Sequence, residues 1–558
     1  MRGFRLERGS QRDPRIAFRL LSALDELSAN RRVSHIVYAA SLVFFFALVL
    51  LPPVFGIILK LDKVVEVLRD PALLGRSWSA ISWSFILAFA VSAIDLILGI
   101  PLAWLIARRD PKLGRIVDTL ADMPFIIPTV ALGFSTLLFW GPDGVASLFL
   151  GQALLKPGLA LVVLVHFVFS LPVVIRVMVG ALSGYRQTFE IAAKTLGAEP
   201  FTAVRTVTLP ILRPSIIASF LLSFARSLSE TGATVIVAGT FENGPVLIKN
   251  AKDAGLEGPI SFVSFVLIGG SVIAFLLIKY IGPKLKLPIS RVWPEHERKL
   301  SRPDAALTRD LVSLLVFICL ALAPSLFVAL PSLYALFDGT FIEAVSGRGV
   351  WSTYWQSMAL SYIIGIIVTV ANMLTGMPMA VLIARRKLGK ALTSLMDGLV
   401  NIPIVVPSIA LGISLNSFWR TVGALPEFWV LTLSHLTITY TYFVSAMSAA
   451  IESVPVYLED TARTLGARPL TVFRRIVLPL TKYSLFSGAI LVFTRSVDET
   501  GAAAAVSEKL KTVPVLLVDW VKGTVEVSRS TQSLGVGILI AVSFIALLAF
   551  RVAVEKRR

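Results

Sequence analysis

Long apolar runs recur along this chain and limit its fold more than any other feature. Runs near or above the roughly 20 residues that cross a bilayer occur repeatedly. Hydrophobic residues make up 56% of the 558 residues and charged residues only 16%, whereas a soluble protein of this length would carry far more charge. The runs are continuous, and the strands of a membrane barrel would instead alternate over roughly ten residues. We therefore predict an all-α, polytopic membrane protein.

Twelve segments are predicted to span the membrane, six in each half of the chain. They are about 33–59, 78–107, 119–140, 159–182, 214–238 and 260–281, then 311–330, 355–384, 402–418, 428–450, 483–506 and 536–550. The basic, proline-containing stretch between the halves reads as a cytoplasmic linker. We divide the chain into a basic cytoplasmic arm (1–32), a first repeat of six spans (33–283), the linker (284–309) and a second repeat of six spans (310–558).

The second half repeats the first in the same direction. The segment EIAAKTLGAEPFTAVRTVTLP at Glu190–Pro210 returns as EDTARTLGARPLTVFRRIVLP at Glu459–Pro479, an offset of 269 residues. LIARRD at Leu105–Asp110 likewise returns as LIARRK, and RSLSETGA at Arg226–Ala233 returns as RSVDETGA. Parallel repeats place both copies of a loop on the same side of the membrane, and an inverted repeat would not. We therefore predict two parallel six-helix repeats.

Glycine and proline punctuate both copies of this repeated segment. Glycine at the end of one helix and proline in the first turn of the next is the usual stop–start pattern. We therefore predict two short helices that meet at an angle at Gly197, and again at Gly466. The mixed polar and apolar residues suit a helix pair at the membrane surface with one face offered to a partner. An ordinary cytoplasmic loop is the alternative, and the second copy argues against it.

The net charge of +18 could indicate nucleic acid, but its placement indicates a membrane. Arg and Lys gather in the N-terminal arm, in short loops beside apolar runs, in the linker and in the tail Lys556–Arg558. This is the positive-inside bias of cytoplasmic loops, so we predict both termini and both hairpins inside, and no nucleic-acid partner. The first apolar run is too long for the core of a signal peptide, so we expect it to be retained as a span.

The sequence contains no catalytic signature. It has no P-loop order of Gly, four residues and Gly-Lys-Ser/Thr, no HExxH, and no cluster of Cys and His. We therefore predict no catalytic residue, no metal site and no cofactor in this chain; an intramembrane enzyme would need a nucleophile–base pair. His166 and His435 share the repeat offset and are interpreted as architectural. For Asp95 and its counterpart Asn372 we favour hydrogen bonds between helices over contact with a substrate.

Charged residues within the predicted fifth span of each half are more informative, because each is expensive in hydrocarbon. They form two pairs spaced four residues apart, Arg226 with Glu230 and Arg495 with Glu499. Two interpretations stay open. Each pair locks two helices as an ion pair, or the pairs line a translocation path while Gly232 and Gly501 allow close helix approach. The repeat slightly favours the path.

The repeated hairpin resembles the EAA loop of ABC-importer permeases, in which E-A-A, three residues, Gly, nine residues and I-x-L-P recur. The position of the strict Glu holds Ile191 beside Glu190 in the first copy, and Asp460 beside Glu459 in the second; Thr461 replaces the first Ala of that copy. These departures leave the Gly and Leu-Pro frame intact. The resemblance implies a coupling role for Glu190, Ala192, Ala193, Gly197, Leu209, Pro210, Glu459, Asp460, Ala462, Gly466, Leu478 and Pro479.

This resemblance implies a fused permease of a type I binding-protein-dependent ABC importer in the inner membrane of a prokaryote. Its partners would be two copies of a P-loop ATPase that binds the ATP, an extracytoplasmic solute-binding protein and membrane lipid. The span with Arg226 would line the pathway. The arrangement is similar to permeases for ferric iron and thiamine, which we expect, while the ETGA segments resemble the EFGA of molybdate and sulfate permeases. An ion-coupled secondary transporter is the rival class.

Overall fold

The computed structural model describes residues 25–109, 111–142, 144–145, 155–284, 294–423 and 425–555. Most of the predicted basic arm, the first part of the linker and the tail Lys556–Arg558 lie outside the described residues. Within the described ranges the secondary structure is helical, with no strand. The predicted all-α fold class is therefore confirmed.

The helices follow the same order in both halves. In the first half they are α2 (Arg31–Phe44), α3 (Leu51–Ile58), α4 (Leu61–Leu68), α5 (Pro71–Arg108), α6 (Pro111–Ala121), α7 (Met123–Ile126), α8 (Thr129–Trp140), α10 (Leu159–Gly184), α11 (Thr188–Thr195), α12 (Pro200–Ala203), α13 (Leu209–Ser229), α14 (Gly232–Val237), α15 (Gly244–Asp253) and α16 (Glu257–Ile281). In the second half they are α17 (Pro294–Leu300), α18 (Pro303–Val316), α19 (Ala323–Phe327), α20 (Ala329–Tyr334), α21 (Thr340–Ser346), α22 (Val350–Ala384), α23 (Lys390–Val400), α24 (Ile402–Val405), α25 (Ser408–Phe418), α26 (Glu427–Glu452), α27 (Val456–Thr464), α28 (Pro469–Val472), α29 (Leu478–Val497), α30 (Gly501–Val506), α31 (Val513–Val521) and α32 (Arg529–Glu555).

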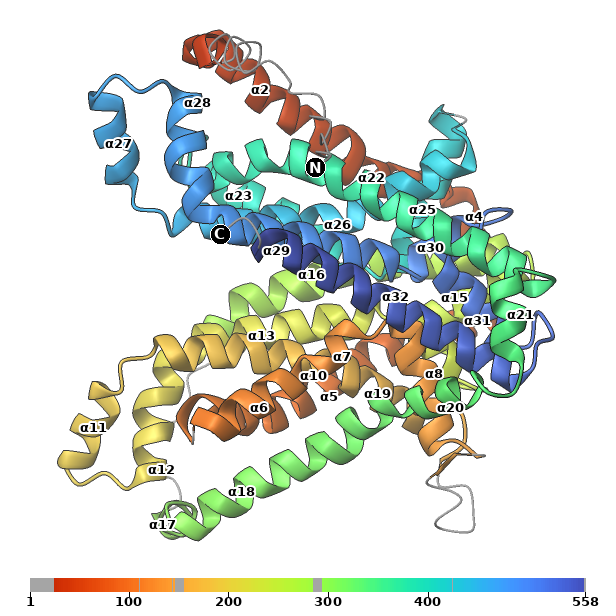
Figure 1. Ribbon diagram of the computed structural model, residues 1–558, viewed down its shortest axis with the longest axis horizontal. Coiled ribbons are helices and arrows are strands. Elements are labelled where there is room, and N and C mark those ends of the chain that lie inside the picture. Colours follow the sequence, from red (N-terminus) through yellow and green to blue (C-terminus); the bar gives the residue numbers. More distant parts are fainter. Residues whose placement is uncertain are drawn as a thin grey trace, which may run out of the picture.

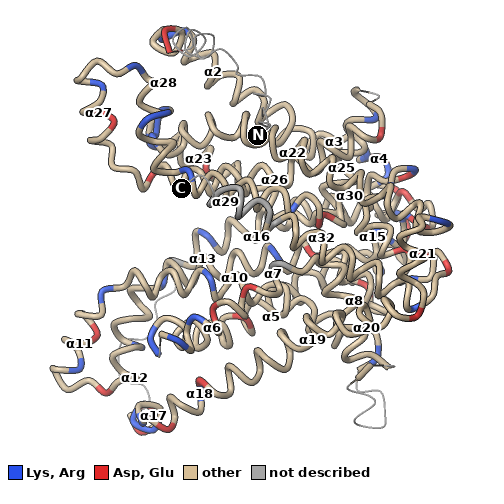
Figure 2. The backbone as a smooth tube through the Cα atoms, in the orientation of Figure 1, with Lys and Arg blue, Asp and Glu red and all other residues tan. Residues whose placement is uncertain are grey.

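Nine helical runs within the described residues are long and apolar enough to cross a membrane. The bent pair 390–405 and 408–423, with an angle of 102° at the break, makes a tenth. The two remaining predicted spans correspond to the broken run α6–α8, whose apolar part is Thr129–Trp140, and to the 26-residue α26. Lys, Arg, Asp and Glu gather at the two ends of the long axis, with few in the band between them (Figure 2). This distribution fits a chain that crosses a bilayer along that axis.

Proline shapes four of these helices in the same way. Turns of π-helix at 45–50, 204–208, 317–322 and 473–477 each end two residues before a proline, namely Pro52, Pro210, Pro324 and Pro479. A proline cannot donate the usual bond to the carbonyl four residues back, and its ring crowds that carbonyl. The wider π turn changes the bonding pattern just before it, so each helix continues through its proline.

The sequence analysis predicted a short second helix in each hairpin and a separate fifth span after it. This expectation is wrong, because the π turns let the helix continue through its proline. The second helix of each hairpin does not end at Leu-Pro before a separate fifth span. Residues Pro200–Ser229 and Pro469–Val497 each form one continuous helical run. Gly197 and Gly466 do separate two helices as predicted, with φ of 89° and 84°.

The first span of each repeat packs against the other repeat. The run from α2 to α3 contacts α22, α25 and α26, while α18 and α19 contact α5 and α8; Figure 1 shows α2 beside α22 and α18 beside α5. The two hairpins, α11–α12 and α27–α28, project from the same end of the molecule, where the two sides of the fold stand apart (Figure 1). Away from that end, the starts of the short helices α14 and α30 bring the two sides into contact.

Candidate functional site

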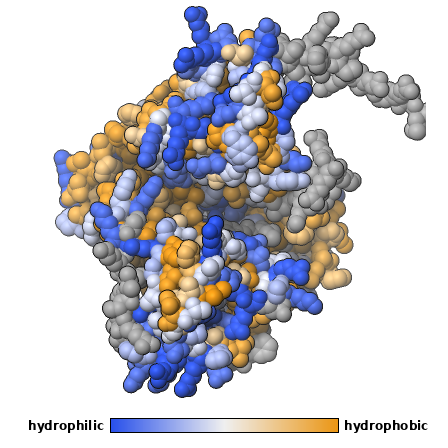
Figure 3. Space-filling model, turned by 90° about the vertical axis from the view of Figure 1, so that its left-hand side faces the viewer, coloured by the Kyte–Doolittle hydropathy of each residue, from blue (hydrophilic) through white to orange (hydrophobic). Residues whose placement is uncertain are grey.

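A cavity of about 400 Å³ lies between the two repeats. Both halves supply its wall: Leu222 and Arg226 come from α13, while Thr494 and Arg495 come from α29. Its other polar lining residues are Asn401, Thr441, Tyr442, Ser445, Asp498 and Ser543. Seen from the end that carries the hairpins, the molecule is hollowed between the two parts that bear them (Figure 3). The cavity therefore occupies the position expected of a central path.

Two glycines let the two repeats touch near Asp498, which lines this cavity. A Cβ atom at Gly232 would lie 2.8 Å from Oγ1 of Thr500, and one at Gly501 would lie 2.2 Å from Oγ of Ser408 and 2.8 Å from Oγ1 of Thr231. Real Cβ atoms do not approach other atoms so closely. The N-termini of α14 and α30 thus cross at a distance that excludes any side chain, and both helices are buried throughout. We call this crossing the gate.

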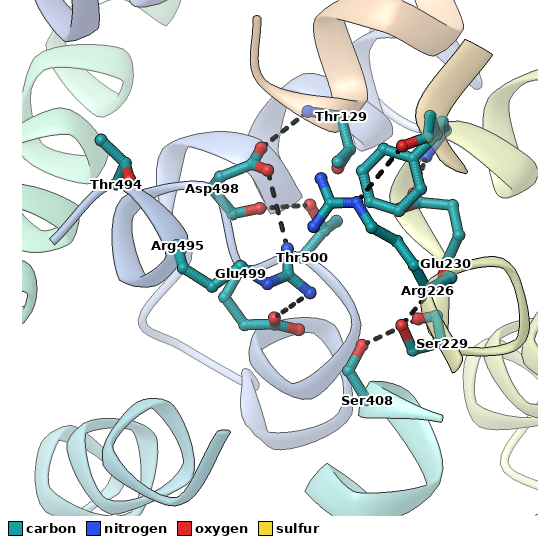
Figure 4. A network of polar contacts seen from close by, with 12 residues as sticks. Thr129, Arg226, Ser229, Glu230, Ser408, Thr494, Arg495, Asp498, Glu499 and Thr500 are labelled. Carbon is teal, nitrogen blue, oxygen red and sulfur yellow. Dashed lines mark hydrogen bonds and ion pairs between the residues drawn. The ribbon is translucent and has the colours of Figure 1, made fainter. Parts of the chain in front are cut away.

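Charged side chains from both repeats meet beside the gate (Figure 4). Nη2 of Arg495 lies 3.2 Å from Oε2 of Glu499, and Nη1 lies 3.7 Å from Oδ2 of Asp498. The other arginine differs, because Nε of Arg226 donates to the carbonyl of Phe169 at 3.3 Å and its guanidinium lies 3.7 Å over the Phe169 ring. The equivalent position in the second repeat is Ile438, which offers no ring. The two repeats therefore hold their arginines in different ways.

The glutamates next to these arginines cap the gate helices. Oε1 of Glu230 accepts the backbone N–H of Ala233 at 2.8 Å, and Oε1 of Glu499 accepts that of Ala502 at 3.0 Å. A carboxylate at a helix N-terminus satisfies amides that have no partner within the helix. Both glutamates are buried. In this structure the repeated Glu-Thr-Gly thus forms the cap of each gate helix, a role that the spacing alone did not indicate.

One position breaks the symmetry of the gate. Asp498 stands where the first repeat has Ser229. Oδ1 of Asp498 accepts the N–H of Thr129 at 2.7 Å, at the start of α8 in the other repeat. On the opposite side, Oγ of Ser408 at the start of α25 donates to the carbonyl of Ser229 at 3.3 Å. The gate is therefore joined to the broken third span of each repeat, with a carboxylate on one side only.

Among the residues for which the sequence analysis predicts a coupling role, each hairpin has one buried carboxylate, and several of the others are exposed. Glu190 and Glu459, at equivalent positions, are 7% and 6% exposed. Glu190 accepts from Lys194 at 2.7 Å and from Thr208 at 3.2 Å, whereas Glu459 accepts from Nε of Arg385 at 2.8 Å. Glu190 thus joins α11 to the helical run that follows it, and Glu459 joins α27 to the end of α22. Thr208 and Arg385 both lie in segments that the repeat contains, but the repeat does not show that they contact these carboxylates.

The residues at the strict Glu position face outward instead. Ile191 is 56% exposed, and the side chain of Asp460 is 61% exposed. Of the remaining candidates, Ala192, Gly197, Gly466 and Pro479 are exposed, and Ala193, Ala462, Leu209, Pro210 and Leu478 are half-buried.

The most exposed apolar side chains of the hairpins are Leu196 and Leu465, at 89% and 84%. Each directly precedes the hairpin glycine, in the repeated Leu-Gly-Ala. Large apolar side chains that are almost fully exposed at equivalent positions of two repeats indicate a contact surface for a partner. The repeated sequence contained this signal, but hydropathy alone could not show that these leucines point outward.

Other intramembrane polar residues join helices, as the sequence analysis favoured. Asp95 accepts from Ser223 at 2.6 Å and also from Ser170, while Asn372 donates to Thr439 at 2.8 Å. His166 and His435 lie close to equivalent serines, with Nδ1···Oγ distances of 2.8 Å to Ser227 and 3.0 Å to Ser496. These residues connect α5, α10 and α13 in one half and α22, α26 and α29 in the other.

Comparison with known protein families gives two matches within this chain. The family described as "Binding-protein-dependent transport system inner membrane component" matches residues 99–287 and 376–558. Each match covers most of one repeat, including its hairpin and its gate helix. The two together cover well over half of the chain.

Individual relatives match about one repeat each. The chain is 31% identical over 203 residues to the sulfate transport system permease protein CysT of Salmonella typhimurium, covering 35% of this chain and 72% of that protein. It is 35% identical over 166 residues to the molybdenum transport system permease protein ModB of Mycobacterium tuberculosis, covering 29% and 63%. It is 27% identical over 229 residues to the molybdate/tungstate permease protein WtpB of Pyrococcus abyssi, covering 41% and 86%.

Proposed function

We propose that this chain, which belongs to the family of binding-protein-dependent transport system inner membrane components, is the fused permease of an ATP-driven ABC importer. Two repeats in one chain would supply both halves of one translocation path. The ion-coupled secondary transporter finds no support among the relatives, whose names are those of transport-system permease proteins.

One observation carries this proposal. The helical runs Pro200–Ser229 and Pro469–Val497 begin in the hairpins and end at the cavity wall. A force applied to the tip of a hairpin would therefore reach Arg226 or Arg495 through one continuous helix. No loop that could absorb the movement interrupts either run.

The mechanism follows from this connection. Two copies of a P-loop ATPase would bind the hairpin tips, one at Leu196 and one at Leu465. Closure of the ATPase dimer on ATP would draw the hairpins together and tilt the two helical runs. The gate would then separate and open the cavity toward the opposite end, where a solute-binding protein delivers its cargo. Hydrolysis would restore the closed gate.

With this mechanism the chain would lie in the inner membrane of a prokaryote, with both hairpins in the cytoplasm. The positive-inside bias supports that orientation. Membrane lipid would be the partner of the outward-facing spans. The charge distribution gives no reason to propose a nucleic-acid partner. ATP would be bound by the partner subunits.

For the substrate we propose an oxyanion of the sulfate or molybdate class, in place of the iron or thiamine type expected from the sequence. The relatives named above are permease proteins for sulfate, molybdenum and molybdate/tungstate. The cavity wall includes the two arginines Arg226 and Arg495, and guanidinium groups suit tetrahedral oxyanions.

Uptake by the native host tests the substrate. Cells that lack this chain, and the same cells with the chain restored, are compared for uptake of sulfate, molybdate, ferric iron and thiamine. We expect loss and recovery of sulfate or molybdate uptake, with iron and thiamine uptake unchanged. Loss of iron or thiamine uptake instead would contradict the oxyanion assignment.

A further inference from the structure

The proposed function leaves two segments without a role, namely the residues that precede the first span of each repeat. One is the described end of the basic arm, from Asp25 to Asn30, and the other is α17 with Ser301 in the linker. In the structure each of them lies against a hairpin. The arm reaches the hairpin of the second repeat, and the linker reaches that of the first.

In the linker, a buried carboxylate and a serine bind the hairpin. Glu297 is 3% exposed. Its Oε2 accepts from Oγ1 of Thr202 at 2.7 Å, and its Oε1 lies 2.8 Å from Nη2 of Arg205. Oγ of Ser301 accepts the N–H of Phe201 at 3.1 Å. We call this set of contacts the linker clasp.

The arm makes the same two kinds of bond at the equivalent positions of the other hairpin. Oδ2 of Asp25 accepts from Oγ1 of Thr471 at 2.6 Å, and Oδ1 accepts the N–H of Thr471 at 2.9 Å. Oγ of Ser28 accepts the N–H of Leu470 at 3.1 Å. We call this set the arm clasp. Thr471 and Leu470 are 269 residues after Thr202 and Phe201, so both clasps hold the same point of the repeat.

That point is the start of the helical run that leads to the cavity. Pro200 and Pro469 occupy its first turn, and the residues before them, Glu199 and Arg468, make no capping bond with their own side chains. The first amides of a helix have no partner within it and need an external acceptor. The clasps supply those acceptors from a distant part of the chain.

We propose that Asp25, Ser28, Glu297 and Ser301 are positioning residues that fix each coupling hairpin to the first span of the opposite repeat. The chain runs from the arm clasp into α2, which packs on α22, and from the linker clasp into α18, which packs on α5. Each hairpin, its helical run and the crossing span then move as one unit. This inference rests on the proposed function, because it assigns these segments a part in coupling.

Isosteric substitutions test the clasps with little risk to folding. Thr202→Val and Thr471→Val remove only the hydroxyl group, and Thr202→Ser and Thr471→Ser retain it. Glu297→Gln and Asp25→Asn remove the charge. Glu295→Gln and Glu26→Gln are the matched controls, because both side chains are exposed in the same segments. Each variant is purified with the ATPase and binding protein and reconstituted in vesicles.

Two readouts are measured on every variant. The first is amide hydrogen exchange of the peptides that contain Phe201 and Leu470. The second is the number of ATP molecules hydrolysed per sulfate or molybdate ion taken up. We expect the Val, Gln and Asn variants to exchange about fivefold faster at these peptides, the factor for loss of a typical helix cap, and to hydrolyse more ATP per ion. The Ser variants and both controls should match the wild type.

The outcomes separate this inference from the proposed function. If wild-type complex transports but the Val, Gln and Asn variants keep the wild-type coupling ratio, the clasps do not position the hairpins. Faster exchange without a change in that ratio would make the clasps structural only and would overturn the inference as well. Failure of the wild type to bind an ATPase would instead remove the proposed function itself.

Discussion

Gly232 and Gly501 show at the scale of single residues what a sequence can predict about a contact. Their place in a repeated motif inside a span predicts close helix approach. The motif does not show which residues each glycine meets, because Thr500 at Gly232 and Thr231 at Gly501 come from the opposite repeat and Ser408 comes from another helix of the same repeat. The same holds for Arg226, since its bond to Phe169 depends on a residue in another helix. The identity of these residues thus predicted that each makes a close contact with another helix, but it did not predict which residue is contacted.

The gate makes a direct prediction for Gly501. In Gly501→Ala the new methyl group would lie 2.2 Å from Oγ of Ser408 and 2.8 Å from Oγ1 of Thr231, so these side chains or the helices that carry them must shift, at a cost of about 1–3 kcal/mol. We expect a lower midpoint of thermal unfolding in detergent. Gly398→Ala is the control, because its Cβ atom meets open space in α23 and alanine favours a helix by about 1 kcal/mol. Equal midpoints for the two variants would contradict the gate geometry.

A second residue-scale prediction concerns the hairpin carboxylates. Glu459→Ala would leave Arg385 without its carboxylate in a site where its side chain is 11% exposed. Removing one member of a buried ion pair costs about 3 kcal/mol or more. Asp460→Ala removes a carboxylate that is 61% exposed and should cost at most about 1 kcal/mol. Denaturation of the two variants in detergent compares them, and a larger loss in Asp460→Ala would refute the assigned roles.

At the scale of elements, the hairpin turn was predictable and the helix that follows it was not. Gly197 and Gly466 have positive φ, the conformation that a glycine after a helix indicates. The sequence analysis instead predicted a short second helix in each hairpin, with a break between it and a fifth span at 214–238 or 483–506. The π turns remove that break, and nothing in the local sequence distinguishes a proline after a π turn from one that starts a helix. The continuous helix that joins each hairpin to the cavity wall could therefore not be predicted from the sequence.

The turn yields a prediction for transport. Gly197→Arg and Gly466→Arg force a residue with a side chain into φ near 85°, although the space around each Cβ atom is open. We expect a folded, inserted protein whose ATP-dependent uptake is strongly reduced, because the tip is displaced. Gly523→Arg provides the control, since its φ is 75° with open space around the Cβ atom, and it follows α31, which Figure 1 shows away from the hairpins. Uptake that falls equally in Gly523→Arg would show that strain alone is responsible.

For the whole molecule, hydropathy and the 269-residue repeat predicted the helical class, the spans and the common direction of both hairpins. They did not predict that the first span of each repeat crosses to the other. An apolar run shows that a helix lies in the membrane but not which helix it packs against, because lipid and protein interiors are similarly apolar. The arm clasp and the linker clasp depend on this packing of each first span against the other repeat, so they could not be predicted from the sequence either.

The central claim is that the two hairpins couple this chain to an ATPase. The most direct test is purification of the tagged chain from native membranes in mild detergent, beside a Leu196→Arg, Leu465→Arg double variant. Phe337→Arg is the control, because Phe337 is 87% exposed and lies between α20 and α21, which Figure 1 shows at the end away from the hairpins. We predict that a P-loop ATPase accompanies the wild type and Phe337→Arg but is lost from the double variant. An ATPase that stays bound to the double variant would contradict the assignment of the hairpin tips.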